Sequence, residues 1–338
     1  MTKKYLVVGA GLAGAVYARV LAEAGFGVDI IDKRSHIAGN CYDFVNDYGI
    51  RQHKYGAHIF HTSNERVVNW LGRFTEWTEY KHRVLAKVNH TEYHVLPINQ
   101  DTQKLYSREQ ILDIFYRPYT KKMWGVELDQ LSPKIVERVP IRDDDNDLYF
   151  PNDRFHYLPK HGYTTMFEQI FDHNNISVSL GTTFKQSMEK NYDHVFNCMA
   201  IDEYYDYCFG DLPYRSIKFQ TLTLPEERIY VTSVVNFTTY TGPTRVIEWK
   251  NFPGHGQGPQ TTLTYEYPCD YRENECERYY PVQDRSGVNK KIYERYAEIP
   301  NVKVSFIGRC GTYQYLDMHQ IVSSSLAGAE KFIKQFKE

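Results

Sequence analysis

The apolar and polar positions of the first 32 residues predict a strand, a tight turn, a helix and a second strand. Residues 5–8 form a continuous apolar run, as expected for a central parallel strand that is buried on both faces. An alanine-rich helical stretch follows to about Ala24, Gly25 ends it, and residues 28–32 ("VDIID") supply the next strand. The start of the chain therefore predicts a doubly wound α/β domain.

Apolar spacing further along the chain predicts helices, a hairpin and a second sheet. Helical spacing occurs at 64–74, 107–124, 163–173 and 317–336. Ser107 is expected to cap the second of these helices, and Pro118 either limits it or begins another. The pattern also predicts a hairpin at 82–97 and short strands at 176–181, 194–199 and 302–308. From about 214 to 282, alternating strands predominate, which predicts a mostly antiparallel sheet. The acidic run at 143–147 is expected to be a solvated turn.

Composition excludes some classes of function. The net charge of −2 and the pI near 6.7 argue against a nucleic-acid-binding or membrane-surface protein. The 6 cysteines lack CxxC spacing, so we expect free thiols in a reducing compartment. No apolar run approaches the roughly 20 residues of a membrane span, and the N-terminus shows no signal-peptide pattern. A cytoplasmic protein is expected. The 29 tyrosines suit either a polar ligand pocket or a tyrosine-rich sheet.

The strongest local motif is a glycine-rich turn after the first strand. Gly9, Gly11 and Gly14 form GxGxxG, in which the glycines allow a tight turn, close approach of a pyrophosphate and close helix–sheet packing. The helix N-terminus that follows attracts negative phosphates. Asp32, at the end of the second strand, can accept hydrogen bonds from ribose hydroxyls. The motif therefore predicts a dinucleotide site.

The segment after Asp32 favours FAD over NAD. It contains Lys33, Arg34, Gly39 and Asn40, and a similar basic, glycine-rich segment runs alongside FAD in proteins of the glutathione-reductase type. A nicotinamide-dependent dehydrogenase would more usually continue into a helix here.

The stretch "HKYGAHIFH" (53–61) holds three histidines and allows three interpretations: a metal site, a catalytic loop or a histidine-rich core. No cysteine or carboxylate joins the histidines, so we expect no metal. Glycine and alanine beside His58 suit a loop whose backbone approaches a planar ring. Near the C-terminus, the helix beginning at Asp317 follows a strand that ends at Gly308. Its N-terminus would stabilise negative charge on a flavin, while the simpler interpretation is an ordinary helix capped by Asp317, and both can hold together.

Several longer motifs together resemble the UDP-galactopyranose mutase family: "HKYGAHIFHT", "YTKKMWG", "ERVPIR", "TRVIEWKNF", "YYPV" and "YLDMHQ", in collinear order over nearly the whole chain. The resemblance implies a flavoenzyme that interconverts UDP-galactopyranose and UDP-galactofuranose without net redox change. It also implies that reduced FAD acts through its N5 atom as a nucleophile on the anomeric carbon, with NADH or NADPH as the expected reductant.

The resemblance also assigns roles to residues, with Arg138, Arg245 and His58 as the catalytic group. It places His58 on a mobile loop against the isoalloxazine ring with His61 nearby, Tyr119 and Trp124 beside the uracil, Arg138 and Arg245 on the diphosphate, Tyr149, Tyr280 and Tyr315 as phenolic partners of the diphosphate, Asp317 and Met318 near the sugar and flavin, and Arg309 beside the flavin or its diphosphate.

The expected fold class is α/β with a discontinuous FAD-binding Rossmann-like domain. This domain comprises 1–80, 150–200 and 300–338. An antiparallel-sheet substrate domain is expected at 201–299, and a helical and hairpin region at 81–149. That region is shorter than in bacterial members of the family, so a monomer or a dimer different from the usual one is expected. Ala38, Phe155 and Leu316 also depart from the family pattern.

Other functions remain open at this point. One alternative is an amine-oxidase-like flavin oxidoreductase, and another is a non-catalytic flavin or nucleotide-sugar binding protein. A third is a mutase for another UDP-sugar such as UDP-N-acetylgalactosamine.

Overall fold

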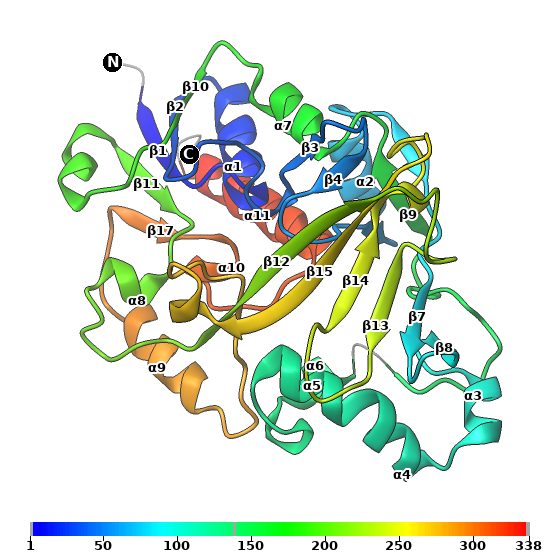
Figure 1. Ribbon diagram of the computed structural model, residues 1–338. Helices are drawn as coiled ribbons and strands as arrows, with labels where there is room; N and C mark the ends of the chain where they lie inside the picture. Colours follow the sequence, from blue (N-terminus) through cyan, green and yellow to red (C-terminus); the bar gives the residue numbers. More distant parts are fainter. Residues whose placement is uncertain (1–2, 138–139, 336–338) are drawn as a thin grey trace.

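The computed structural model describes residues 3–137 and 140–335, and it contains a five-stranded parallel sheet and a seven-stranded sheet (Figure 1). The parallel sheet has the order β10-β2-β1-β11-β17. Its strands are β1 (Lys4–Val8), β2 (Gly27–Asp32), β10 (Ile176–Leu180), β11 (His194–Asn197) and β17 (Val304–Phe306). Three segments that are far apart in sequence thus build one sheet, as expected for a discontinuous Rossmann-like fold.

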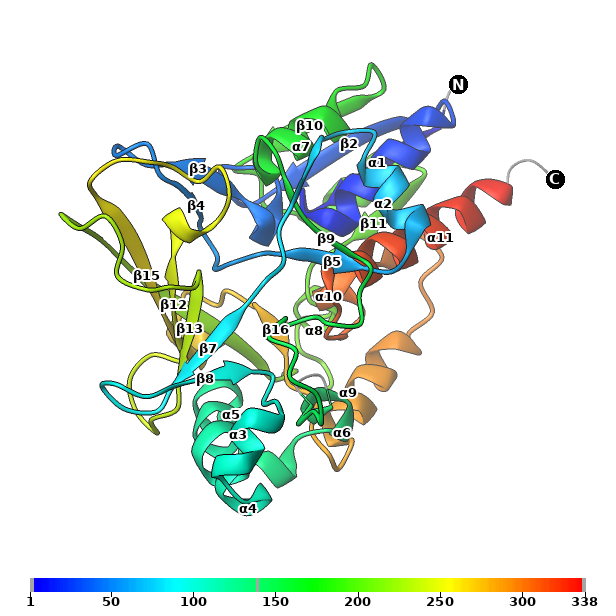
Figure 2. The same ribbon diagram turned by 90° about the vertical axis from the view of Figure 1, so that its right-hand side faces the viewer.

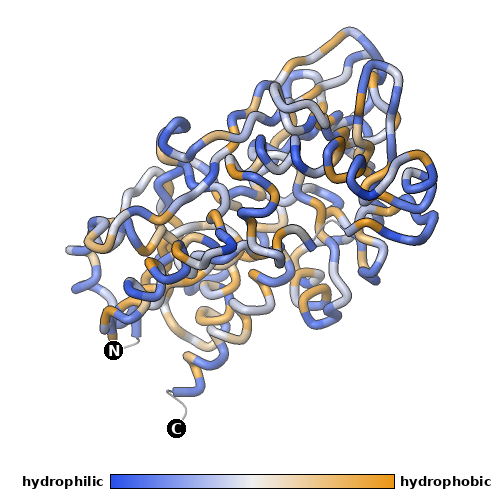
Figure 3. The backbone as a smooth tube through the Cα atoms, turned by 90° about the horizontal axis from the view of Figure 1, so that it is seen from below, coloured by the Kyte–Doolittle hydropathy of each residue, from blue (hydrophilic) through white to orange (hydrophobic). Residues whose placement is uncertain are grey.

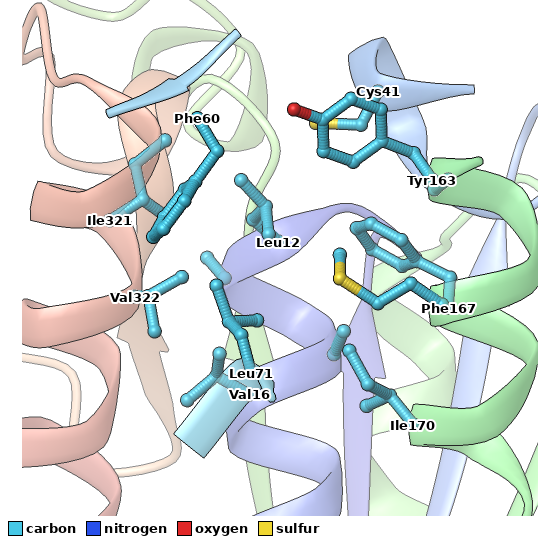
Figure 4. Packing of buried hydrophobic residues seen from close by; sticks show 14 of the residues in the cluster. Leu12, Val16, Cys41, Phe60, Leu71, Tyr163, Phe167, Ile170, Ile321 and Val322 are labelled. Atoms are coloured by element: carbon cyan, nitrogen blue, oxygen red, sulfur yellow. The ribbon is translucent and has the colours of Figure 1, made fainter. Parts of the chain in front are cut away.

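Helices cover the parallel sheet and form the main core with it. They are α1 (Leu12–Glu23), α7 (Tyr163–Phe171) and α11 (Met318–Lys334), and α2 (Glu65–Leu71) packs against α11. Leu12 and Val16 of α1 lie between Phe167 and Ile170 of α7 on one side and Val322 of α11 on the other (Figure 4). The Asn64 side chain accepts a hydrogen bond from the Val67 amide and thereby caps α2. The helix predicted at 317–336 is confirmed to residue 334.

The second sheet is mostly antiparallel, as predicted, and has the order β16-β12-β15-β14-β13-β7-β8. Its strands are β7 (Val84–Lys87), β8 (Tyr93–Leu96), β12 (Tyr214–Leu224), β13 (Val234–Phe237), β14 (Arg245–Glu248), β15 (Thr261–Asp270) and β16 (Tyr280–Pro281). The predicted hairpin at 82–97 is β7–β8, and it extends this sheet through a parallel pairing of β7 with β13. The division of the chain into domains stays a prediction.

A helical region lies at one end of the second sheet (Figures 1 and 2). It contains α3 (Gln100–Leu105), α4 (Arg108–Ile111), a π-helical turn (Leu112–Tyr116), α5 (Arg117–Trp124), a short 3₁₀ turn (Leu128–Gln130) and α6 (Pro133–Val136). Ser107 and Gln110 form a capping box at the start of α4, as expected. Pro118 stands in the first turn of α5, where its missing N–H costs nothing, and Gly125 ends that helix in the left-handed conformation.

Smaller elements connect the two sheets. β3 (Asp43–Val45) pairs with β4 (Arg51–His53), while β5 (Phe60–Thr62), β9 (Phe155–Pro159) and β6 (Trp77–Glu79) form a three-stranded sheet. The helix α10 (Gly308–Gly311) lies beside β16, and α8 (Ile201–Tyr204) packs against α9 (Val288–Ala297). Residues 143–147 have no helix or strand and are mostly exposed, as expected.

Hydrophobic and hydrophilic segments are interspersed along the backbone (Figure 3). Within residues 3–137 and 140–335, no helix is both long enough and apolar enough to cross a membrane.

Candidate active site

A cavity of about 330 Å³ lies at the carboxyl ends of β1 and β2. The predicted dinucleotide residues Gly9, Gly11, Asp32, Lys33, Arg34, Gly39, Asn40, Arg309 and Met318 line it, and so does His58. Thr182–Phe184 also line the cavity. Its place at the carboxyl ends of parallel strands suits a dinucleotide.

The glycines at this edge are required by close backbone approaches. A Cβ atom on Gly14 would lie 1.9 Å from the Gly9 carbonyl oxygen, so only glycine lets α1 start this close to β1. Gly39 has a φ of +54°, and a Cβ atom there would lie 2.9 Å from the Gly11 Cα. Ala38 has a φ of +70°, a conformation that usually favours glycine, which gives a physical meaning to the departure from the family pattern at this position.

Asp32 is fixed by backbone amides at the end of β2. Its Oδ2 atom accepts a hydrogen bond from the Ala10 amide at 2.8 Å, and its Oδ1 atom accepts one from the Arg34 amide at 2.9 Å. The carboxylate therefore faces the cavity from a rigid position, and its remaining lone pairs can accept hydrogen bonds from ribose hydroxyls.

Charged residues from both sheets meet over this cavity. The Glu277 carboxylate, in the loop before β16, lies 3.2 Å from the Lys33 Nζ and 2.5 Å from the Arg34 Nη2. Arg34 also donates to the Asn40 Oδ1 atom at 3.0 Å, and its guanidinium lies over the Tyr55 ring at 4.3 Å. We call the contact of Glu277 with Lys33 and Arg34 the Glu277 clasp, because it joins the loop to the segment that follows β2.

His58 lines the cavity as a neutral imidazole. Burial, and then the nearby Arg309 and Arg245, lower the pKa of His58 to about 4. Its Nδ1 atom lies 2.8 Å from the Gly56 carbonyl oxygen, which can only accept, so Nδ1 carries the proton and Nε2 holds a lone pair. Its backbone amide donates to the His53 Nδ1 atom at 3.0 Å, which orders the loop.

The other two histidines of the 53–61 stretch have different surroundings. His53 is buried against the Trp249 ring at 5.0 Å, and burial keeps its pKa well below the usual value. His61 stacks on Phe150 at 3.4 Å, and its Nδ1 atom lies 2.6 Å from the Asp153 carboxylate. Among the residues that the structure describes, no group of three His, Cys, Asp or Glu side chains could hold a metal ion.

Arg245 and Tyr119 lie beyond His58, on the side of the second sheet. The Arg245 Nε atom lies 2.5 Å from the Oε2 atom of Glu266, on the neighbouring strand. Burial alone would lower the pKa of Arg245, but the Glu266 carboxylate raises it above its ordinary value. The electrostatic neighbours of Tyr119 include Arg245, Tyr149 and Tyr315, so α5 presents a phenol next to the guanidinium.

An aromatic cluster connects α5 to the start of α11. The Trp124 ring meets Tyr280 edge-on at 4.8 Å and Tyr315 at 5.5 Å. The Arg309 guanidinium lies 5.2 Å above the Tyr315 ring, and the Arg309 Nε donates to the Leu316 carbonyl at 2.7 Å. Arg309 thus touches the dinucleotide cavity and the aromatic cluster together.

The remaining predicted residues occupy varied positions. Tyr149 lies beside His82 and Phe150 at ring distances of 5.7 and 4.9 Å. Asp317 forms a capping box with Gln320 at the start of α11, so its prediction as the cap of this helix is confirmed. Arg138 lies outside the described residues, so its role stays a prediction.

Three residues at this site were not singled out from the sequence. Tyr279 lines the cavity, and its hydroxyl donates to the Tyr55 carbonyl at 2.6 Å. Glu266 partners Arg245, and Glu277 forms the clasp. Strand alternation in "TYEYP" gives a weak signal for Glu266, because it places that side chain on one face of β15. Nothing in the sequence indicates the partner of Glu277.

Comparison with known proteins adds a family to this geometry. A family profile described as UDP-galactopyranose mutase matches residues 114–315, and one described as NAD(P)-binding Rossmann-like domain matches residues 7–74. A probable UDP-galactopyranose mutase of Klebsiella pneumoniae is 34% identical, over 98% of this chain and 95% of that protein. A dTDP-fucopyranose mutase of Escherichia coli is 32% identical, over 99% of this chain and 100% of that protein.

Solved structures agree with the fold. A crystal structure of reduced UDP-galactopyranose mutase superimposes with a TM-score of 0.78 at 15% identity, covering 99% of this chain and 96% of that one. A putrescine oxidase structure bound to putrescine has a TM-score of 0.58 at 12% identity, covering 99% of both chains, which shows a shared fold alone. The alignment with the Klebsiella protein spans 370 positions, more than the 338 residues of this chain, so that relative has residues that this chain lacks. The chain belongs to the UDP-galactopyranose mutase family of isomerases.

Proposed function

We propose that the protein interconverts UDP-galactopyranose and UDP-galactofuranose with FAD bound in the cavity at the ends of β1 and β2. One observation carries the proposal: Arg245, Tyr119 and the Trp124 cluster lie close to His58 and Arg309, which line that cavity. A cation, phenols and an aromatic cluster suit a nucleoside diphosphate, and the cavity beside them suits a flavin dinucleotide.

The residues of the cavity fit FAD. Gly9 and Gly11 leave room for a pyrophosphate at the start of α1, and Asp32 is positioned to accept the adenosine ribose hydroxyls. The loop around His58 and the residues Arg309 and Met318 would bound the isoalloxazine end. When bound and reduced, FAD would supply the nucleophile for the anomeric carbon of the sugar.

The chain's own side chains would bind and orient the substrate. Arg245 and Arg138 would hold the diphosphate, because guanidinium groups form paired hydrogen bonds with phosphate oxygens. Glu266 would keep Arg245 pointing into the site. Tyr119, Tyr149, Tyr280 and Tyr315 would supply phenolic hydrogen bonds or ring contacts, and Trp124 would border the uracil. His58 would stay neutral near pH 7 and keep the flavin-facing loop in place.

The likeness to a dTDP-fucopyranose mutase supports a second candidate. That relative is as similar to this chain as the UDP-galactopyranose mutases are, at 32% against 34% and 31% identity. The protein would then act on another sugar nucleotide, either dTDP-linked or a UDP-sugar such as UDP-N-acetylgalactosamine. The residues around the sugar decide between these substrates.

The first experiment measures conversion of UDP-galactofuranose by the purified holoprotein, with its flavin oxidised and then reduced by dithionite. Conversion only after reduction supports the proposal. With flavin bound and no conversion in either state, the galactose assignment is wrong, and dTDP-fucofuranose is tested next under the same conditions.

Two substitutions test the substrate side. Arg138→Ala and Arg245→Ala are each expected to lose most turnover and to retain flavin. Full activity in both variants, or loss of flavin in both, would contradict the roles given to these arginines.

The proposal extends to the reductant of the flavin and to the oligomeric state. NADH or NADPH would reduce the flavin from the substrate side, which anaerobic bleaching of the flavin absorbance tests. The protein would be a monomer or a dimer different from the usual family dimer, and analytical ultracentrifugation decides between them.

A further inference from the structure

Lys122 links the helix that carries Tyr119 and Trp124 to the strand that carries Arg245. Its Nζ atom donates to the Phe237 carbonyl at 3.0 Å and to the Pro243 carbonyl at 2.7 Å. These carbonyls stand at the two ends of the turn between β13 and β14.

Pro243 precedes Arg245 by two residues. Between them, the Thr244 amide donates to the Glu266 carbonyl at 2.8 Å, so this short segment is tied to β15. A shift of the β13–β14 turn would therefore move the start of the strand from which the Arg245 guanidinium projects.

The C-terminal turn of α5, which carries Lys122, is also bonded to a different part of the same sheet. Arg215 of β12 donates to the Met123 carbonyl and to the Lys122 carbonyl, each at 3.1 Å. The Tyr280 hydroxyl of β16 donates to the Met123 carbonyl at 2.5 Å. These bonds satisfy the last carbonyls of α5 and anchor its C-terminus to β12 and β16, whereas the Lys122 side chain reaches β13 and β14.

The ammonium group of Lys122 is well suited to this contact. Burial lowers the pKa of Lys122 to about 8, so the group is mostly charged at pH 7. A charged donor makes stronger hydrogen bonds to carbonyl oxygens than a neutral one, by roughly a factor of two. The contact therefore resists separation of α5 from the turn.

A nucleoside diphosphate has a fixed span between its base and its diphosphate. If α5 holds the base and β14 holds the diphosphate, a ligand that contacts both requires the helix and the strand at a matching separation, and a 1 Å misplacement can cost about 100-fold in rate. We propose that Lys122 is a positioning residue that keeps the base subsite of α5 in register with the diphosphate subsite of Arg245. The inference rests on the proposed function.

The proposal separates ligands that span both subsites from ligands that occupy one. In Lys122→Met, which keeps most of the side-chain volume and removes both hydrogen bonds, the Kd for UDP should rise at least tenfold. The Kd for uridine and the Kd for inorganic pyrophosphate should each stay within twofold, because each subsite remains intact.

The test is a set of NMR binding titrations with UDP, uridine and pyrophosphate on the FAD-loaded protein. Lys121→Met is the matched control, because Lys121 is exposed and pairs with Glu127 on the surface. Lys122→Arg should restore most of the UDP affinity, since a guanidinium can also donate to both carbonyls. Steady-state kinetics of Lys122→Met should show a raised KM for the sugar nucleotide with unchanged flavin content.

Each contrary outcome is distinct. Unchanged UDP affinity in Lys122→Met overturns the positioning role alone. Weakening of all three ligands together with a lowered Tm also overturns it, because that result is general destabilisation. A parent protein that does not bind UDP overturns the proposed function and the positioning role together.

Discussion

The Arg245 guanidinium and the Glu266 carboxylate form a buried ion pair with 2.5 Å between Nε and Oε2, and the glutamate side chain is fully buried. The two residues are directly opposite each other on β14 and β15. Within the described part of the chain, the Oε1 atom of Glu266 is buried and has no hydrogen-bond partner. It lies so close to Gly56 that a Cβ atom added there would be only 2.4 Å from it. The pair therefore connects the proposed diphosphate site with the loop that carries His58.

Glu266→Gln is expected to impair catalysis more than its small change in shape suggests. The substitution leaves Arg245 as a buried cation with a neutral partner, and breaking a buried pair typically costs about 3–5 kcal/mol when one partner is removed. We expect kcat/KM to fall by about 10- to 100-fold, equivalent to about 1.4–3 kcal/mol, and the Tm to fall. Steady-state kinetics and thermal unfolding measure both, and Glu273→Gln, in the exposed turn after β15, is the control. An unchanged kcat/KM would show that Arg245 is oriented without Glu266.

Glu277→Gln is expected to accelerate release of FAD. The substitution removes the charge that holds the loop before β16 to Lys33 and Arg34, at 3.2 and 2.5 Å. Because Arg34 and Glu277 are part-buried at the cavity and Lys33 is exposed, we expect the flavin dissociation rate to rise about 3- to 10-fold, which corresponds to a loss of about 1 kcal/mol. The recovery of flavin fluorescence after dilution gives this rate. Arg34→Lys should have a similar effect, and a rate equal to that of the parent in both variants would sink the idea of a clasp.

Gly39→Ala is expected to weaken FAD binding more than it weakens the fold. The new methyl group would lie 2.9 Å from the Gly11 Cα, at the edge that would face the pyrophosphate. Gly25→Ala is the matched control, because Gly25 also has a positive φ, +91°, but its added Cβ meets no atom within 4 Å. Both variants carry backbone strain of about 1–2 kcal/mol, so the difference between them isolates the contact. Equal flavin content in the two purified variants would contradict this prediction.

The protein is expected to lose stability as the pH falls from about 6.5 to 4. Burial lowers the pKa of His58 to about 4, that of His82 to about 3 and that of His255 to about 4. Between pH 6.5 and 4 the unfolded chain binds protons at these sites that the folded chain does not. The free energy of unfolding therefore rises with pH across this window, and the stabilisation from these histidines is fully present above it. Each histidine contributes up to about 3 kcal/mol.

Urea unfolding at several pH values measures this dependence. His255→Gln should reduce the slope, because it removes one of these histidines. His255 is chosen because it is packed on Trp249 and is not among the residues that line the dinucleotide cavity. His90→Gln, at an exposed position between β7 and β8, is the control. A slope that is the same in the parent protein and His255→Gln would show that another group dominates the acid response.

The local features of the fold could be predicted from the sequence because they depend on neighbouring residues. The GxGxxG turn, the capping residue Ser107 and the cap at Asp317 each act within a few positions, and the structure confirms all of them as local structure. The alternating strands at 214–282 also formed the expected antiparallel sheet.

The long-range pairings could not be predicted in the same way. The hairpin β7–β8 joins β13, about 150 residues later, and no local pattern specifies that partner. Glu266 and Glu277 are recognisable as site residues only once strand register and loop position bring them to Arg245 and Arg34. The pairing of His61 with Asp153 likewise depends on long-range contacts. The assigned place of His61 beside the flavin loop stays a prediction.

The division of the parallel sheet among three distant segments has a consequence for biosynthesis. Gly308, Arg309, Met318 and Ile321 line the dinucleotide cavity, and they follow β17, the last strand of the parallel sheet in chain order. A nascent chain that has not reached residue 321 therefore has the glycine turn and Asp32 but no closed cavity. Because domains generally fold as units, the cofactor is expected to bind only after α11 has left the ribosome. Until β17 has been synthesised, the edge of β11 that pairs with it has no partner strand.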